Sequence, residues 1–174
     1  MLDVLKNVEK ELPKLLKDRS LWKSLYIDYH PPFVERMWTP WSDYRIYLHR
    51  IHPCTEDEAL LHPHPWPSAM KVFGEYEMGL AFGAGQEPPI VFATIILGHG
   101  DVYEMTHRDG WHYVRPIGKP SFSLMITGKP WERWSPSATK ELRPLTAEEE
   151  KRLLKFFRIR YPSKKVLTYF CGQY

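Results

Sequence analysis

The sequence predicts a mainly β fold, in which one antiparallel sandwich or barrel carries helical segments at both ends. Between residues 61 and 128, short runs of strand-forming residues alternate with turns that contain glycine or proline, a pattern typical of sandwiches and barrels. Both ends of the chain instead carry apolar residues at helical spacing. A length of 174 residues is sufficient for one domain with a substantial core.

The elements follow in chain order. Helical spacing predicts a helix over residues 2–16 and a second, short helix over residues 20–26, so residues 1–43 are expected to form an N-terminal helical extension. The barrel core is placed at residues 44–130, beginning with a strand over 44–51. Further strands are expected at residues 69–73, 76–80, 91–97, 102–106, 112–116 and 121–127. Residues 131–174 are expected to form a C-terminal helix, which begins at the Thr146–Glu149 capping box, and a tail with a last strand or extended segment at 166–170.

Composition excludes several classes of function. The net charge of +3 is small and comes from 24 basic and 21 acidic residues, so it gives no indication of nucleic-acid binding. No apolar run approaches the roughly 20 residues of a membrane span, and the N-terminus has no signal-peptide pattern. The two cysteines, Cys54 and Cys171, do not make a disulfide framework. We therefore expect a cytoplasmic protein that binds neither nucleic acid nor membrane.

The segment His62-Pro63-His64-Pro65 is the strongest chemical signal. Alternate residues of an extended chain point the same way, so His62 and His64 present two imidazoles to one side. The prolines favour extended neighbours and stiffen this geometry. Two neutral imidazoles are good ligands for a divalent transition metal. The alternative is a proline-rich loop with surface histidines.

In its wider context this segment resembles the cupin superfamily, and the resemblance covers residues 45–130. The family's first motif contains two histidines one residue apart, a glutamate, a strand and a glycine, which His62, His64 and Gly74 match except for the glutamate. The second motif runs from a glycine to a third histidine. Gly100 and His112 match it with a separation of twelve residues, one more than is usual. The resemblance implies a cupin-type jelly-roll β-barrel with a metal ion bound by His62, His64 and His112.

The departures from the family pattern concern the fourth ligand. No acidic residue stands at positions 67–69, where the family places its glutamate. The resemblance therefore implies a three-histidine site, as in cupins that include the ferrous thiol dioxygenases, with open positions for substrate or oxygen. Glu77 and Glu104, on neighbouring expected strands, are candidates for a carboxylate from elsewhere, or else form surface salt bridges. His107 is the substitute ligand if His112 points away.

Two cations are candidates for substrate binding. Arg50 ends the strand that leads to the histidines, and Lys71 lies between apolar residues of the next strand. A cation that faces the barrel interior can hold a substrate carboxylate or phosphate, whereas alternation can equally direct both side chains to solvent. Aromatic side chains suggest either a rim at the pocket mouth or packing of the terminal helices. These are Trp38, Trp41, Trp66, Trp111, Trp131 and Trp134.

These observations favour a metal-dependent cupin enzyme that acts on a small, anionic molecule. The favoured interpretation is a three-histidine non-haem Fe(II) oxygenase with one divalent metal ion per chain, for which Zn, Ni or Mn are the alternatives. Catalytic roles are assigned to Arg50, Lys71, Glu77 and Glu104. The alternative functions are a redox-neutral isomerase, epimerase or lyase, and a non-catalytic ligand-binding module. We also expect a homodimer formed through sheet edges or terminal segments, unless the termini fold back onto their own barrel.

Overall fold

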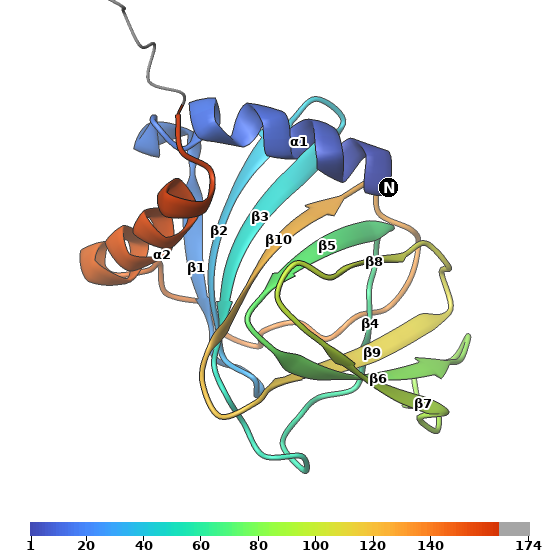
Figure 1. Ribbon diagram of the computed structural model, residues 1–174. Coiled ribbons are helices and arrows are strands. Elements are labelled where there is room, and N and C mark those ends of the chain that lie inside the picture. Colours follow the sequence, from blue (N-terminus) through green and yellow to red (C-terminus); the bar gives the residue numbers. More distant parts are fainter. Residues whose placement is uncertain (164–174) are drawn as a thin grey trace, which may run out of the picture.

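The computed structural model describes residues 1–163, in which two antiparallel sheets pack face to face as a barrel (Figure 1). The larger sheet contains, in spatial order, β1 (Lys23–Ile27), β2 (Val34–Trp41), β3 (Tyr44–Ile51), β10 (Ser121–Thr127), β5 (Ser68–Phe73) and β8 (Val102–Met105). The smaller sheet contains β4 (His62–Pro63), β9 (Gly110–Pro116), β6 (Tyr76–Phe82) and β7 (Ala93–Leu97). The predicted mainly β class is confirmed.

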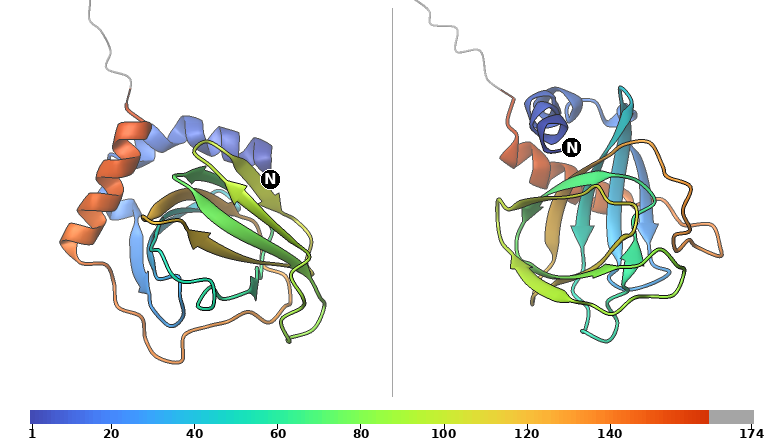
Figure 2. Two further views of the ribbon diagram at one scale, coloured as in Figure 1. Left: turned by 60° about the horizontal axis from the view of Figure 1, so that its bottom comes forward. Right: turned by 90° about the vertical axis from the view of Figure 1, so that its right-hand side faces the viewer.

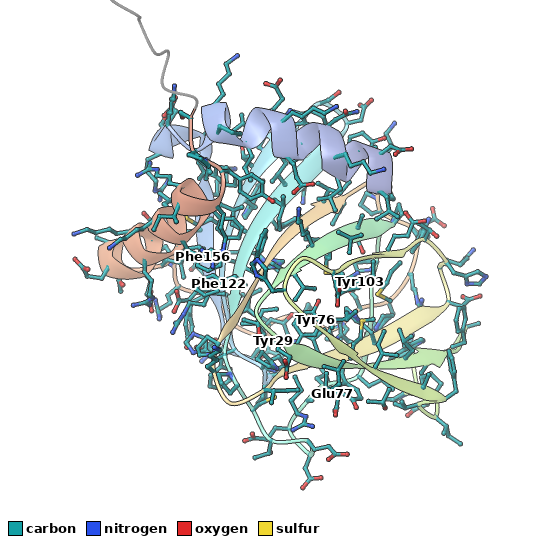
Figure 3. The ribbon with its side chains drawn as sticks, viewed as in Figure 1. Tyr29, Tyr76, Glu77, Tyr103, Phe122 and Phe156 are labelled. Atoms are coloured by element: carbon teal, nitrogen blue, oxygen red, sulfur yellow. The ribbon has the colours of Figure 1, made fainter. Side chains whose placement is uncertain are left out.

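Two helices cover the outer face of the larger sheet (Figure 2). They are α1 (Leu2–Leu15) and α2 (Ala147–Arg160), and α2 begins at the predicted capping box, where Thr146 and Glu149 bond to each other's backbone. Phe156 of α2 stacks on Phe122 of β10, with ring centroids 3.6 Å apart (Figure 3). The main hydrophobic core therefore lies between the helices and the sheet, outside the barrel.

Strand alternation separates this outer core from the barrel interior. In β3, Ile46 and Leu48 belong to the core under the helices, whereas Tyr47 and His49 face inward. The inner apolar clusters are small, for example Tyr47, Met70 and Met125. Because the main core lies outside the barrel, the interior is left open for a cavity.

The N-terminal third differs from the prediction. Residues 20–26 form no α-helix: a 3₁₀ turn at Arg19–Leu21 is followed by β1, which pairs with β2 over its whole length. The assignment of residues 1–43 to a helical extension was therefore wrong in part, since two of the six strands of the larger sheet lie within it. Pairing between β1, β2 and β3 overrides the local helical spacing, which is only a weak signal over seven residues.

Two further expectations lie at the limits of the described chain. The predicted segment 166–170 and Cys171 lie outside the described residues. Within residues 1–163, neither helix has the length and hydrophobicity needed to cross a membrane.

Candidate metal centre

The structure brings the three predicted histidines together. His62 of β4 pairs in register with His112 of β9, and His64 follows two residues later in the extended, proline-rich segment. One ring nitrogen from each histidine lies within 4.8 Å of the other two. The Nε2 atoms of His64 and His112 are 2.8 Å apart. The local motif and the strand pairing thus place the three histidines at one point of the barrel wall.

Hydrogen bonds behind the rings fix which nitrogen faces this point. The Nδ1 atom of His62 lies 2.9 Å from the carbonyl oxygen of Leu60, which can only accept, so Nδ1 carries the proton. The Nδ1 atom of His64 lies 3.0 Å from the Ser68 hydroxyl, which can accept in the same way. Both Nε2 atoms then offer a lone pair toward the centre, the arrangement found in histidine ligands of metal ions.

The geometry and protonation of this group fit a divalent transition-metal ion. Two imidazole nitrogens that bind one ion at right angles, each at about 2.05 Å, are about 2.9 Å apart, close to the observed distance between His64 and His112. Burial lowers the pKa of His62 to about 4, and it lowers the pKa values of His64 and His112 well below the ordinary range. All three imidazoles are therefore neutral at pH 7, as metal ligands must be.

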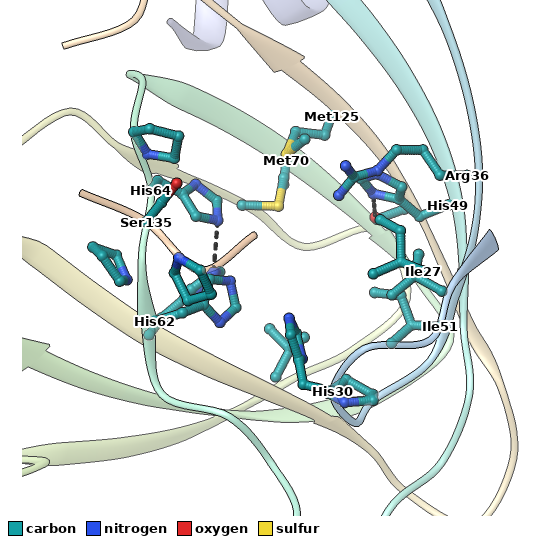
Figure 4. A pocket seen from close by; sticks show the side chains of 18 of the residues that line it. Ile27, His30, Arg36, His49, Ile51, His62, His64, Met70, Met125 and Ser135 are labelled. Atoms are coloured by element: carbon teal, nitrogen blue, oxygen red, sulfur yellow. Dashed lines mark hydrogen bonds between the residues drawn. The ribbon is translucent and has the colours of Figure 1, made fainter. Parts of the chain in front are cut away.

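The histidines form one wall of a cavity of about 140 Å³ inside the barrel. Figure 4 shows Arg36 and His49 on the opposite side, with Met70 and Met125 between the two groups. Other lining side chains are mainly apolar or aromatic: Ile27, Tyr29, Val34, Ile51, Trp66, Tyr76, Tyr103 and Val114. No Asp or Glu within residues 1–163 lines the cavity.

Arg50 and Lys71 lie outside the cavity, contrary to their expected position. His49 faces inward, so its neighbour Arg50 faces outward, where it forms an ion pair with buried Glu35. Lys71 points from β5 toward α1 and lies 2.6 Å from Glu9. Strand parity is the physical reason, because adjacent residues of a strand face opposite sides of the sheet.

The two candidate carboxylates also lie away from the histidines. Glu77 accepts hydrogen bonds from Tyr113 (2.9 Å) and Arg115 (2.9 Å), so it forms a salt bridge on the sheet. Glu104 lies 3.3 Å from the N-terminal amino group. Neither residue lines the cavity, nor does His107. The structure therefore places a group of three histidines in the described part of the chain with no carboxylate beside it.

The tryptophans do not form one rim. Trp66 lines the cavity, whereas Trp111 is buried, donates a hydrogen bond to the Gly83 carbonyl and lies tilted against Trp134. Trp41 packs against the outer core beneath the helices. Most of these side chains therefore serve packing, and only Trp66 is positioned to contact a ligand.

Sequence reasoning missed Arg36 and His49 as a unit. They are cross-strand neighbours on β2 and β3, in one row with Ser123 of β10. Arg36 Nε donates to His49 Nε2 (3.0 Å), and His49 Nδ1 lies 3.1 Å from Ser123 Oγ. The available signal was the strand pattern of residues 34–41, which would have placed Arg36 on the same face as Trp38.

Comparison with known proteins supports the fold. No protein-family profile and no curated protein sequence matches the chain. Among solved structures, Fe(II)-HppE with an alternative substrate matches with a TM-score of 0.50 and 11% identity, over 63% of this chain and 57% of that one. AerE from Microcystis aeruginosa matches with a TM-score of 0.48 and 17% identity, over 72% and 53% of the two chains. KdgF from Halomonas sp. matches with a TM-score of 0.44 and 14% identity, over 60% and 87%.

These similarities bear on the fold alone, because the identities are low and the chain spans about half the length of HppE and of AerE. Together with the two antiparallel sheets and the terminal helices, the similarity to HppE at a TM-score of 0.50 confirms the predicted cupin-like jelly-roll fold. The fold and the three histidines define the class: a cupin-like barrel with a group suited to a divalent metal ion.

Proposed function

We propose that the protein is a metal-dependent cupin enzyme of the three-histidine, non-haem Fe(II) oxygenase type, which converts a small molecule inside the barrel. The observation that carries this proposal is the set of three neutral imidazoles at one point of the cavity wall, with no carboxylate near them in residues 1–163. HppE, which shares the fold, was solved with Fe(II).

The chain's own residues have defined tasks in this proposal. His62, His64 and His112 bind the ion, and Leu60 and Ser68 orient the first two rings. When bound, Fe(II) supplies open coordination positions at which substrate and O₂ are activated. The mainly apolar walls of the cavity limit the access of bulk water to these positions.

A pair of tyrosine hydroxyls in the cavity wall supplies a proton donor whose present acceptor, a thioether sulfur, is weak. The Tyr76 hydroxyl donates to that of Tyr103 (2.9 Å), which in turn donates to the sulfur of Met70 (3.1 Å). Burial raises the pKa of Tyr103, so its hydroxyl stays protonated. The centroid of the Tyr103 ring lies 6.4 Å from that of the His112 ring, and both side chains line the cavity.

The redox-neutral alternative needs a general base in the cavity. Glu77 and Glu104 are bound elsewhere, so the candidate bases among the described lining residues are the imidazoles of His30 and His49. His49 already accepts a hydrogen bond from Arg36 and is held by Ser123, which leaves it no free lone pair. This occupation removes His49 as a base and leaves His30, whose Nδ1 lies 3.0 Å from the Pro31 carbonyl oxygen, as the general base that proton-transfer chemistry would use.

Elemental analysis and oxygen uptake test the proposal. The purified protein is expected to hold about one iron ion per chain and, after anaerobic loading with Fe(II), to consume O₂ with a substrate present. Replacing His62 and His64 together by Ala is expected to abolish iron binding and oxygen uptake. The variant His107→Ala, a change outside the cavity, is expected to leave iron binding and oxygen uptake intact. Zinc or nickel without oxygen uptake would support the redox-neutral enzyme instead, and no metal would support the binding module.

A further inference from the structure

The cavity contains a cation without an anionic partner. Arg36 is the only Lys or Arg that lines it in the described chain, and no acidic residue lines it there. A guanidinium has five N–H donors, and the hydrogen bonds of residues 1–163 use one of them, from Nε to His49 Nε2. The other four have no protein acceptor in the described structure. The donors of Arg36 are therefore available to a ligand.

The surroundings of Arg36 orient it without neutralising it. Its guanidinium packs over the Tyr47 ring, 5.3 Å from the centroid, and His49 is held in turn by Ser123. Burial lowers the pKa of His49 well below its ordinary value, so this imidazole is neutral at pH 7. One positive charge in fixed orientation thus faces the cavity across from His62 and His64 (Figure 4).

A second donor in the same cavity also lacks an acceptor. The indole Nε1 of Trp66 is buried and has no hydrogen-bond partner within residues 1–163. Trp66 stacks on Tyr47, with ring centroids 6.5 Å apart, and its ring lies 6.4 Å from that of His64. Since Arg36 also packs on Tyr47, the two unused donor groups adjoin the same aromatic ring. Buried donors of this kind are normally satisfied, so the ligand is expected to supply acceptors.

We propose that Arg36 binds the carboxylate of a small organic monoacid whose apolar middle spans the cavity toward the three histidines. The planar fork of a guanidinium matches a carboxylate with two parallel hydrogen bonds. In the metal-free protein a single cation balances one negative charge, whereas a phosphate dianion would leave one charge uncompensated in a partly buried site. Met70, Met125 and Ile51 supply the apolar walls between the two ends. The claim that the other end of the ligand lies at the three histidines rests on the proposed function. The claim that Arg36 binds the carboxylate does not.

The test uses metal-free protein, so that it is independent of the metal centre. After chelation, the full chain is titrated calorimetrically with butyrate, with the neutral analogue butyramide and with inorganic phosphate. Butyrate is expected to bind on the order of tenfold to a hundredfold more tightly than butyramide, because only the carboxylate forms a charge-assisted hydrogen bond with the guanidinium. In Arg36→Met this preference is expected to vanish, and Arg36→Lys should restore it in part. The matched control, Arg108→Met, changes an exposed arginine outside the cavity and should behave as wild type.

Each outcome bears on the proposal. Absence of butyrate binding, equal affinity for butyramide, or unchanged affinity in Arg36→Met would overturn it, and a preference for phosphate would overturn the monoacid class. If Arg36→Met does not fold, the Nε–H resonance of Arg36 in the wild-type protein gives the answer, because butyrate must shift it. Metal content of Arg36→Lys is expected to be unchanged. Failure of the oxygenase proposal would therefore be seen in elemental analysis, and it would not change the result of the carboxylate titration.

Discussion

At the scale of single residues, the orientation of the metal-site imidazoles depends on acceptors behind them. His62 is held by a backbone carbonyl, whereas His64 is held by a side chain, the hydroxyl of Ser68. Ser68 is completely buried, so no water replaces its hydroxyl without rearrangement. Of these two hydrogen bonds, only the one from His64 to the Ser68 hydroxyl can be removed by a side-chain substitution. Ser68 is therefore the residue at which the importance of these bonds can be tested.

We expect Ser68→Ala to weaken metal binding by about 10- to 100-fold, because the hydroxyl fixes the tautomer and direction of His64. Competition with a chelator of known affinity measures the change. Ser123→Ala is the matched control, since Ser123 is equally buried in the same sheet but bonds to His49 instead. Equal metal affinity in the Ser68 variant and the wild type would show that the hydroxyl has no such role.

His49 predicts a pH dependence of stability. Burial, and secondarily the charge of Arg36, hold its pKa well below 6.5 in the folded protein. Below about pH 6.5 the unfolded chain takes up a proton at this residue and the folded chain does not, so the free energy of unfolding falls on acidification, by up to about 1.4 kcal/mol per pH unit. Above pH 6.5 the contribution is constant.

The variant His49→Gln keeps an acceptor for Arg36 but cannot titrate. In metal-free protein, its free energy of unfolding in urea is expected to fall less steeply than that of the wild type between about pH 5 and 6.5, by the amount for one proton. His99→Gln, a change outside the cavity, serves as the control. Identical slopes for His49→Gln and the wild type would mean that His49 is protonated in the folded state.

The sequence was informative at this scale where a signal is local. His62 and His64 could be paired because the prolines between and after them favour one extended geometry. Arg50 and Lys71 could not be placed, because their direction depends on strand parity, which no local feature defines. Arg36 was missed for the same reason, since its strand was not identified as one.

At the scale of elements, the helices and the cavity belong to opposite faces of one sheet. α1 packs its buried residues on the outer face, and the row of Arg36, His49 and Ser123 lies on the inner face. Both helices were predicted from apolar spacing and a capping box, and β3 and β10 from their strand-forming residues. β1 was not predicted, because it is stabilised by pairing with β2, a contact that its own composition does not encode.

We expect Leu12→Ala in α1 to destabilise the protein by about 2–5 kcal/mol, because Leu12 is completely buried in the outer core. Metal content per folded chain should stay the same, since the substitution lies on the other side of the sheet. Urea unfolding and elemental analysis measure the two quantities, with exposed Lys10→Ala as the control. Loss of metal from folded Leu12→Ala protein would show that the two faces are coupled.

At the scale of the whole molecule, the packing of the barrel explains why an interior site is available. The helices bury the outer face of the larger sheet and so supply most of the hydrophobic core. The interior can then hold polar side chains whose hydrogen bonds to one another offset their burial, as between His49 and Ser123. Fold class was predictable because it depends on the order of strands and turns, whereas this division of the core depends on tertiary packing.

The homodimer remains a prediction, and the structure indicates where it would form. Within residues 1–163, β7 pairs with β6 on one side only, and it ends the smaller sheet. Around it, Ile90 is 91% exposed, Phe92 63% and Ile96 55%. Residues 88–98 contain no charge that would oppose pairing with a second copy of the same strand. An uncharged, apolar edge of this kind is the type that pairs with another chain.

We therefore expect a dimer in which two β7 strands pair antiparallel about a two-fold axis, which would place Ile96 of each copy in the interface. Ile96→Lys is expected to yield monomers, because it puts a charge on the pairing edge of each copy, where like charges oppose association. Sedimentation or light scattering at micromolar concentration measures the change. Ile159→Lys, an equally exposed position on α2, should leave the dimer intact. A monomeric wild-type protein would contradict the homodimer itself, and a dimeric Ile96→Lys variant would contradict only its location, because α2 and the remaining surfaces would then be the candidates.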